Sequence, residues 1–258
     1  MKPNRLLYLS QKDVVSVGLT MTEIIETLEV AFREKGRGNT EMPPKPGIHP
    51  GGEDNFIHAM PAYIPALNAA GVKWVSGFPG NQKKGLPYIT GLLILNDPET
   101  GIPISVMDCV WITAVRTGAA TALSARHLAR PESSVVGVLG CGVQGRTNVE
   151  ALNTLFPLKR VMAYDVNTEA VRGYADEIGS RLNLEVIPVG ILPHWSILTP
   201  TGIPMPCRRR PSSVPTTHRS CDNISKWAIS RIFLKFMLIW ESWSPDKNRE
   251  ERLPQNGP

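Results

Sequence analysis

The chain has 258 residues, 42% hydrophobic and 20% charged, which is ordinary for a globular protein. We expect no membrane span, because no apolar run reaches about 18 residues, and no secretory signal, because residues 1–15 lack an apolar core. Residues 1–190 hold 18 Lys and Arg against 18 Asp and Glu, so the net charge of +5 arises later in the chain, and a nucleic-acid-binding protein is not supported.

The first segment reads as helix followed by loop. Apolar residues at helical spacing predict a helix over residues 10–35, with Thr20 or Thr22 as the cap of its second part. Glycine and proline dominate residues 35–55, which predicts turns and extended loop. The four cysteines form no close CxxC pair, so we expect free thiols in a reducing cytoplasm and no zinc site.

Short strands and one long helix are predicted next. The strands lie at residues 56–64, 69–80, 88–97 and 102–108. Residues 111–130 are rich in alanine, which allows close packing, and predict a helix that ends before Pro131. Strands and helices then alternate over residues 133–140, 144–156, 159–165, 167–182 and 183–190. This order predicts a parallel sheet of the Rossmann type, whose first strand is apolar enough to be buried on both faces.

A glycine turn follows that first strand in the segment SVVGVLGCGVQG. Gly140, Gly142 and Gly145 satisfy the pattern GxGxxG between a strand and a helix. The first glycine permits a tight turn, the second lets a pyrophosphate approach the backbone, and the third lets the helix pack against the strand. The helix that begins near Val143 then directs its free amides toward the phosphates. A turn kept only for packing is the alternative.

An acidic residue completes the dinucleotide pattern. Asp165 stands 20 residues after Gly145, at the end of the next strand, where a carboxylate accepts hydrogen bonds from ribose hydroxyls. The same carboxylate repels a 2′-phosphate. The sequence therefore favours NAD over NADP as the cofactor.

Residues 191–258 show neither helical nor strand periodicity and hold four of the six Trp and nine of the 23 Pro residues. The strand and helix pairs of a doubly wound sheet do not continue there. Residues 226–243 can form one amphipathic helix, and residues 244–258 have a disordered composition. We expect an atypical tail, either disordered or non-native through a frameshift or a misjoined reading frame, and a Rossmann sheet that is truncated.

Residues 1–190 resemble the ornithine cyclodeaminase/mu-crystallin family. The resemblance is carried by AGVKWVSGFPGN, GLPYITGLLILNDPETG, ITAVRTGAATALSARHLA and GVLGCGVQGR, in the family's order and spacing. It implies an α/β fold with a substrate and dimerisation domain at residues 1–130, the first half of a Rossmann NAD-binding domain at 131–190, and the atypical tail at 191–258. It also implies a homodimer that takes a small amino or imino acid and needs no nucleic acid or membrane.

The resemblance implies roles for several cationic residues. Lys73 and Arg116 match the catalytic residues that bind the substrate carboxylate, and Lys45 stands where the family often has an arginine with the same task. A cation held at a fixed position orients Cα for hydride transfer, and an arginine does so with two parallel hydrogen bonds. The alternatives are a surface Lys73 lying on Trp74, and a structural ion pair between Arg116 and Asp108.

Cofactor contacts are implied at further positions. They are Arg116, Thr117, Gly140, Gly142, Val143, Gln144, Gly145 and Asp165. Tyr88 replaces a cofactor-contacting threonine of the cyclodeaminases, and this departure argues against strict cyclodeaminase activity. The histidines have no metal-ligand spacing, so no metal is expected.

The implied function is an NAD-dependent, ornithine cyclodeaminase-like reaction, with hydride transfer at Cα followed by deamination and cyclisation. The alternatives are an oxidoreductase of the alanine dehydrogenase or ketimine reductase type, and a non-catalytic family member that binds a small molecule. A membrane-surface or nucleic-acid module built on the tail is less favoured. The family's second-half aspartate segment is not recognisable after residue 190, so we expect impaired activity.

Overall fold

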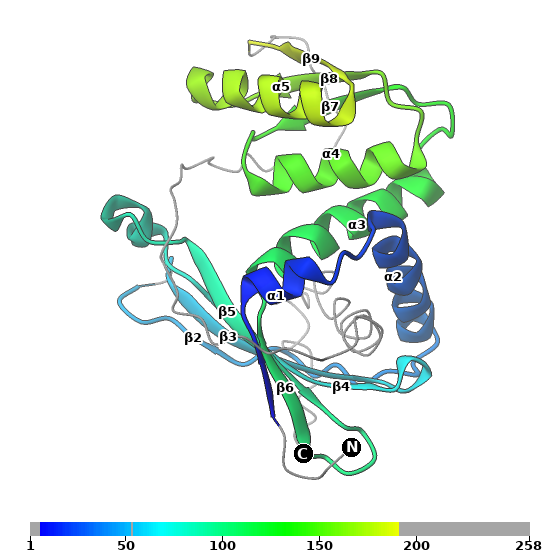
Figure 1. Cartoon of the computed structure of the whole chain (residues 1–258), viewed down its shortest axis with the longest axis vertical. Helices are drawn as coiled ribbons and strands as arrows, with labels where there is room; N and C mark the ends of the chain where they lie inside the picture. Colours follow the sequence, from blue (N-terminus) through cyan, green and yellow to red (C-terminus); the bar gives the residue numbers. More distant parts are fainter. Residues whose placement is uncertain (1–5, 53, 191–258) are drawn as a thin grey trace, which may run out of the picture.

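The computed structural model describes residues 6–52 and 54–190, which form two α/β parts joined by a long helix (Figure 1). The expectations for residues 191–258, including the helix at 226–243, lie outside the described residues. The first part contains β1 (Leu7–Leu9), α1 (Gln11–Ser16), α2 (Met21–Gly36), β2 (Gly47–Ile48), β3 (Phe56–Ile64), β4 (Ala69–Gly77), β5 (Ile89–Asn96), β6 (Pro103–Asp108) and α3 (Val110–Leu128). Short 3-10 turns at Pro65–Leu67 and Pro79–Lys84 follow β3 and β4.

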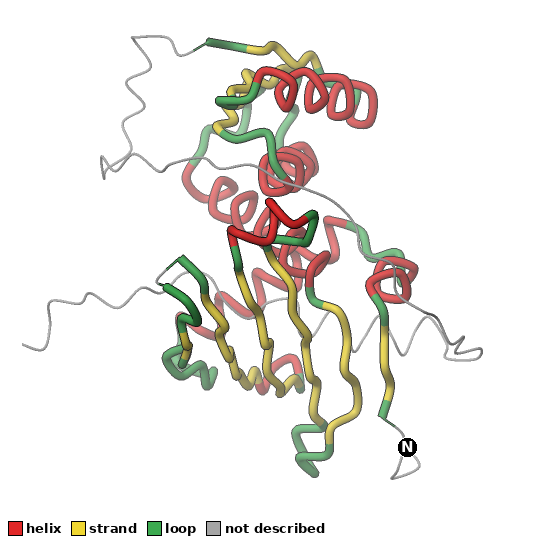
Figure 2. The backbone as a smooth tube through the Cα atoms, turned by 90° about the vertical axis from the view of Figure 1, so that its left-hand side faces the viewer, coloured by secondary structure: helices red, strands yellow, loops and turns green. Residues whose placement is uncertain are grey.

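The first part is built on a six-stranded sheet in the order β1-β6-β5-β4-β3-β2 (Figure 2). β1 and β6 run parallel, and the other neighbours are antiparallel. The predicted strands are present. β1 and β2 were not predicted, because three residues and two residues are too short to show a period in the sequence.

Residues 10–35 are helical as predicted, and the second part is a separate helix, because the chain forms α1 and α2 with a break between them. Gly18 lies in the break with φ +72°, a conformation that only glycine adopts at little cost. The predicted Thr20 cap is present. Its hydroxyl accepts the Glu23 amide at 3.3 Å, and the Glu23 carboxylate accepts the Thr20 amide at 2.8 Å.

The two faces of the six-stranded sheet differ. One face packs against α1, α2 and α3 and forms the main core, which includes Ile64, Leu93 and Met107. On the opposite face, Tyr8, Trp74 and Leu92 are exposed. Since side chains alternate along a strand, neighbouring residues of β4 belong to different faces.

The second part contains β7 (Val135–Leu139), α4 (Val143–Leu155), β8 (Arg160–Tyr164), α5 (Thr168–Leu182) and β9 (Glu185–Pro188). The strands form a parallel sheet in the order β7-β8-β9, as predicted. A second core, which includes Val149, Val161 and Ile178, lies between this sheet and its helices. The chain therefore has the expected α/β fold with a Rossmann-type part.

β7 differs from its predicted burial on both faces. Val135 is exposed, and Leu139 is 72% exposed. Within residues 6–52 and 54–190, β7 pairs with β8 alone and so forms an edge of the sheet. The apolar sequence of β7 is typical of a strand that is buried on both faces. The described residues, however, cover only part of the surface of β7.

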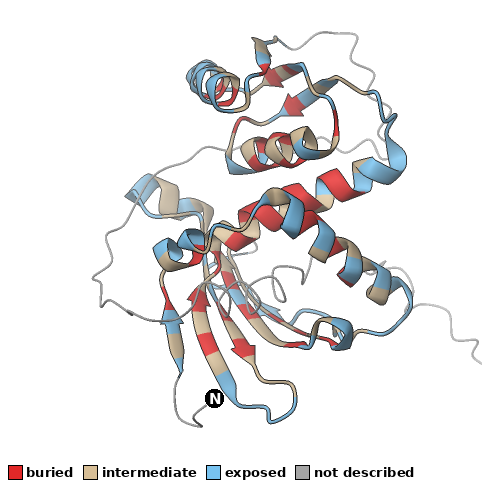
Figure 3. Ribbon diagram, turned by 45° about the vertical axis from the view of Figure 1, so that its right-hand side comes forward, coloured by how far each residue is buried: buried red, intermediate tan, exposed pale blue. Residues whose placement is uncertain are grey.

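The two parts meet where α3 crosses α4 (Figure 3). Gly118 of α3 lies against the backbone of Thr147 of α4, where a Cβ atom would overlap the Thr147 carbonyl. The helix α3 thus lies between the six-stranded sheet and α4. None of the helices in the described part of the chain combines the length and the apolar character needed to cross a membrane.

Candidate functional site

The glycine turn between β7 and α4 has the predicted strand–turn–helix geometry. Gly140 has φ +100°, and its amide donates to the Tyr164 carbonyl at 2.8 Å, which ties the turn to the end of β8. Gly142 is the N-cap of α4, and Val143 is the first helical residue. The helix therefore begins with its unbonded amides at the turn.

Two glycines of the turn are needed for different reasons. A Cβ atom on Gly145 would overlap the Gly140 carbonyl and lie 3.2 Å from Cγ1 of Val138, so the fold itself requires glycine there. A Cβ atom on Gly142 would meet nothing within 4 Å. The space beside Gly142 is open enough for a phosphate group to approach the backbone.

Asp165 lies directly after β8, next to the glycine turn. Its Oδ2 accepts the Cys141 amide at 2.9 Å, and its Oδ1 accepts the Asn167 amide at 2.9 Å. The structure thus brings the predicted acid to the predicted turn.

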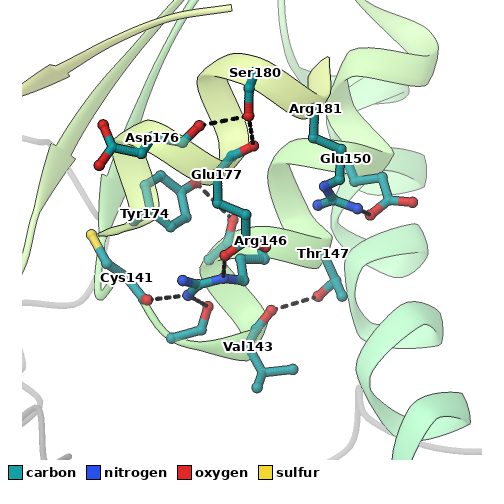
Figure 4. A network of polar contacts seen from close by, with 12 residues as sticks. Cys141, Val143, Arg146, Thr147, Glu150, Tyr174, Asp176, Glu177, Ser180 and Arg181 are labelled. Atoms are coloured by element: carbon teal, nitrogen blue, oxygen red, sulfur yellow. Dashed lines mark hydrogen bonds and ion pairs between the residues drawn. The ribbon is translucent and has the colours of Figure 1, made fainter. Parts of the chain in front are cut away.

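Side chains behind the turn hold it to α5 (Figure 4). Arg146 donates through Nη1 to the Cys141 carbonyl and, at 3.1 Å, to the Gly142 carbonyl. Its Nε donates to Glu177 at 2.7 Å, and its guanidinium lies 5.3 Å from the centre of the Tyr174 ring. The Tyr174 hydroxyl donates to the Gly145 carbonyl at 3.0 Å, and burial raises the Tyr174 pKa.

Two of the predicted substrate cations are buried in the first part. Lys73 on β4 is 5% exposed and Arg116 on α3 is 4% exposed. Lys73 faces the core between Met60 and Leu93, whereas Trp74 points to the other face and is 47% exposed. The interpretation of Lys73 as a surface residue lying on Trp74 is therefore wrong.

Cys109 shows that Lys73 and Arg116 share one neighbourhood. Burial raises the pKa of the Cys109 thiol, and the positive charges of Lys73 and Arg116 both oppose that rise. The thiol is fully buried just before α3 begins. The charges of Lys73, on the inner face of the sheet, and of Arg116, on α3, therefore both act on this thiol.

Asp108 and Arg116 do not form an ion pair with each other. None of the ion pairs between residues of the described part of the chain joins them. Its Oδ1 accepts the Val110 amide at 2.9 Å at the start of α3. Burial raises the Asp108 pKa. Asp108 therefore serves the helix start.

Lys45 lies exposed in the loop before β2. Burial lowers the pKa of His58 on β3, and the charges of Lys45, His49 and Lys73 lower it further. The His58 ring stacks on Phe56 with 4.6 Å between ring centres. The positive charges of Lys45 in the loop and Lys73 on β4 thus both lower the pKa of His58.

The remaining predicted residues lie on α4, on α3 and just before β5. Val143 and Gln144 are exposed in the first turn of α4. Thr117 follows Arg116 on α3 and donates its hydroxyl proton to the Thr113 carbonyl at 2.8 Å. Tyr88 is exposed immediately before β5.

Sequence reasoning missed Cys109, Arg146, Tyr174 and Glu177. A signal existed for Arg146, because a cation in the first turn of a helix opposes the helix dipole and needs a specific reason. Tyr174 and Glu177 share one face of α5 through their i, i+3 spacing, but nothing local links them to the turn. In residues 6–52 and 54–190 no group of three or more His, Cys, Asp or Glu is arranged to hold a metal ion.

Known proteins match most of the described part of this chain. The sequence profile of the Ornithine cyclodeaminase/mu-crystallin family matches residues 7–190. Alanine dehydrogenase of Archaeoglobus fulgidus is 44% identical over 168 residues, covering 65% of this chain and 51% of that protein. The chain thus spans about half the length of the curated relatives it matches.

Two solved structures are similar in fold. The Delta(1)-pyrroline-2-carboxylate reductase of Thermococcus litoralis, in complex with NADH and L-proline, is 37% identical with a TM-score of 0.67, over 70% of this chain and 55% of that one. An archaeal alanine dehydrogenase dimer with bound NAD is 41% identical with a TM-score of 0.66, over 71% of this chain and 56% of that one.

Proposed function

This chain belongs to the ornithine cyclodeaminase/mu-crystallin family, and we propose that it contributes to an NAD-dependent enzyme acting at Cα of a small amino or imino acid. The observation that carries the proposal is the burial of two cations, with Lys73 5% exposed on the inner face of the sheet and Arg116 4% exposed on α3. Such a pair suits the carboxylate of an α-amino acid or its imine. Lys45, which acts on His58 together with Lys73, is a third carboxylate ligand.

The glycine turn and Asp165 fit NAD. The open space beside Gly142 admits a pyrophosphate to the first amides of α4, at Val143 and Gln144. Asp165 accepts hydrogen bonds from the ribose hydroxyls, and its negative charge repels the 2′-phosphate of NADP. Arg116 and Thr117 lie beside the nicotinamide in this proposal, since Gly118 places this part of α3 against α4. When bound, NAD accepts or supplies the hydride at Cα.

Oxidoreduction is the favoured reaction. The alanine dehydrogenase and the pyrroline-2-carboxylate reductase are 44% and 37% identical to the chain, and Tyr88 departs from the cyclodeaminase pattern. Ornithine cyclodeamination is the second candidate, since it names the matching family. Both require hydride transfer at Cα, away from it in oxidation and onto it in reduction, while the cations hold the carboxylate.

An assay of NADH and NADPH oxidation with cyclic imines and with 2-oxo acids plus ammonia tests the proposal. We expect turnover with at least one imine-forming substrate and faster oxidation of NADH than of NADPH. Release of ammonia from ornithine with catalytic NAD identifies a cyclodeaminase instead. Binding of NADH without any turnover favours the non-catalytic alternative, and failure to bind NADH contradicts the proposal. Impaired activity, expected from residues 191–258, stays a prediction that the same assay measures.

The exposed face of the six-stranded sheet supports a homodimer. Tyr8, Trp74 and Leu92 lie on this face, opposite the helices. Large apolar side chains exposed on one face of a sheet are typical of an interface. One solved relative is a dimer. The division of the chain at residue 130 into a dimerisation domain and a nucleotide domain is part of the same proposal.

Trp74→Arg tests the dimer. A buried charge at the centre of an interface is expected to weaken self-association at least about 100-fold, because the loss of a central aromatic residue alone costs about 2 kcal/mol or more. Leu128→Arg is the matched control, because Leu128 is exposed at the end of α3. Light scattering after size exclusion measures the mass of each variant. A dimer that survives Trp74→Arg rules out this face as the interface.

A further inference from the structure

We infer that Arg146 is a positioning residue of the glycine turn: it orients the amides of Gly142 and Val143 toward the cofactor's pyrophosphate. The inference rests on the proposed NAD site. It concerns the side of the turn that faces α5, away from the cofactor.

The contacts of Arg146 converge on the carbonyls of the turn. Nη1 donates to the carbonyls of Cys141 and Gly142, and Nε donates to Glu177 on α5. The Arg146 side chain is 16% exposed, so its bonds to the two carbonyls are partly shielded from water, whereas Glu177 is 44% exposed. The guanidinium thus anchors two successive peptide units of the turn to α5 (Figure 4).

Peptide geometry converts this anchoring into orientation. In a planar trans peptide the carbonyl of one residue and the amide of the next point in opposite directions. When Arg146 draws the carbonyls of Cys141 and Gly142 toward itself, the amides of Gly142 and Val143 must point away from it. Those two amides lie at the start of α4, where phosphate groups bind.

Other turn groups are anchored separately. The Gly140 amide bonds to Tyr164, the Cys141 amide bonds to Asp165, and the Gly145 carbonyl accepts from Tyr174. These contacts fix the two ends of the turn. In the middle of the turn, the Gly142 carbonyl accepts the backbone amide of Arg146 at 3.3 Å. The Arg146 side chain adds a second bond to this carbonyl and a bond to the Cys141 carbonyl.

The task requires the shape of arginine as well as its charge. The planar guanidinium reaches the carbonyls through Nη1 and Glu177 through Nε at the same time, and it lies against the Tyr174 ring. A lysine ammonium has the charge without this planar fork. Arg146→Lys therefore separates orientation of the turn from simple electrostatic attraction of an anion.

A test on the full chain compares Arg146→Gln and Arg146→Lys with the control Arg181→Gln. Arg181 pairs with Glu150 at 2.8 Å and joins the same two helices, α5 and α4, without touching the turn. Binding of NADH, ADP-ribose and adenosine is measured by titration. The backbone order parameters of Gly142 and Val143 are measured by NMR without ligand.

Both Arg146 variants are expected to bind NADH and ADP-ribose about 10- to 100-fold more weakly, as the loss of charge-assisted hydrogen bonds predicts. Adenosine, which has no phosphate, is expected to bind as it does to the wild type. The order parameters should fall from about 0.85 to below about 0.6 in both Arg146 variants and stay unchanged in Arg181→Gln.

Unchanged order parameters in Arg146→Gln, or full NADH affinity in Arg146→Lys, overturn the inference. Equal weakening of adenosine and ADP-ribose also overturns it, because a general loss of folding then explains the result. A wild type that binds no NADH contradicts the proposed function instead. In that case the order parameters alone decide whether Arg146 orients the turn.

Discussion

Arg116→Gln is expected to lower kcat/KM for the amino or imino acid about 100- to 1000-fold, while the affinity for ADP-ribose stays close to that of the wild type. Arg116 is 4% exposed, so glutamine removes a buried charge that no water molecule can replace at low cost. Truncating a buried, hydrogen-bonded charge typically costs about 2–5 kcal/mol. Initial rates of NADH oxidation across a range of substrate concentrations measure the loss.

Arg126→Gln is the matched control for Arg116. Arg126 lies on the same helix, is partly exposed and pairs with Glu29 at 2.7 Å. Its loss should leave kcat/KM unchanged, because surface ion pairs contribute little. Equal activities of the wild type and Arg116→Gln would remove Arg116 from the proposed site.

Gly142→Ala and Gly145→Ala are expected to weaken NADH binding strongly, for different reasons. The Gly142 methyl group occupies the space where the pyrophosphate approaches, and in the free protein it meets nothing within 4 Å. We therefore expect Gly142→Ala to keep the stability of the wild type and to lose at least about 100-fold in NADH affinity. Gly145→Ala forces a methyl group against the Gly140 carbonyl, so it should also destabilise the fold by about 1–3 kcal/mol.

Urea unfolding and NADH titration of the two variants separate these reasons. Gly173→Ala on α5 is the control, since its Cβ atom also meets nothing within 4 Å. It should leave NADH binding intact and raise stability by about 0.4–1 kcal/mol, as alanine does in a helix. Normal NADH affinity in Gly142→Ala would contradict the predicted approach of the pyrophosphate.

The glycine turn and Asp165 could be predicted because their geometry is local. A strand, a GxGxxG turn and a helix follow one another directly, and the acid ends the next strand. Adjacent parallel strands end at the same edge of a sheet, so Asp165 had to lie beside Cys141. The strands and helices between residues 56 and 190 were predictable for the same reason, since each carries its own period.

Long-range contacts were not predictable in this way. Arg146 and Glu177 are 31 positions apart, and only the packing of α5 against α4 brings them together. The exposure of β7 was also missed, because an apolar run does not reveal how many strands flank it.

The sequence by itself determined the α/β order, the phosphate turn and the acid beside it, because periodicity and turn chemistry act over neighbouring residues. Only the tertiary structure decided that Lys73 faces the core and that Lys73 and Arg116 are both buried. It also decided that Arg146 holds the turn from behind. The physical reason is that burial and charge proximity depend on which face of a strand or helix is covered, and that is set by packing between distant segments.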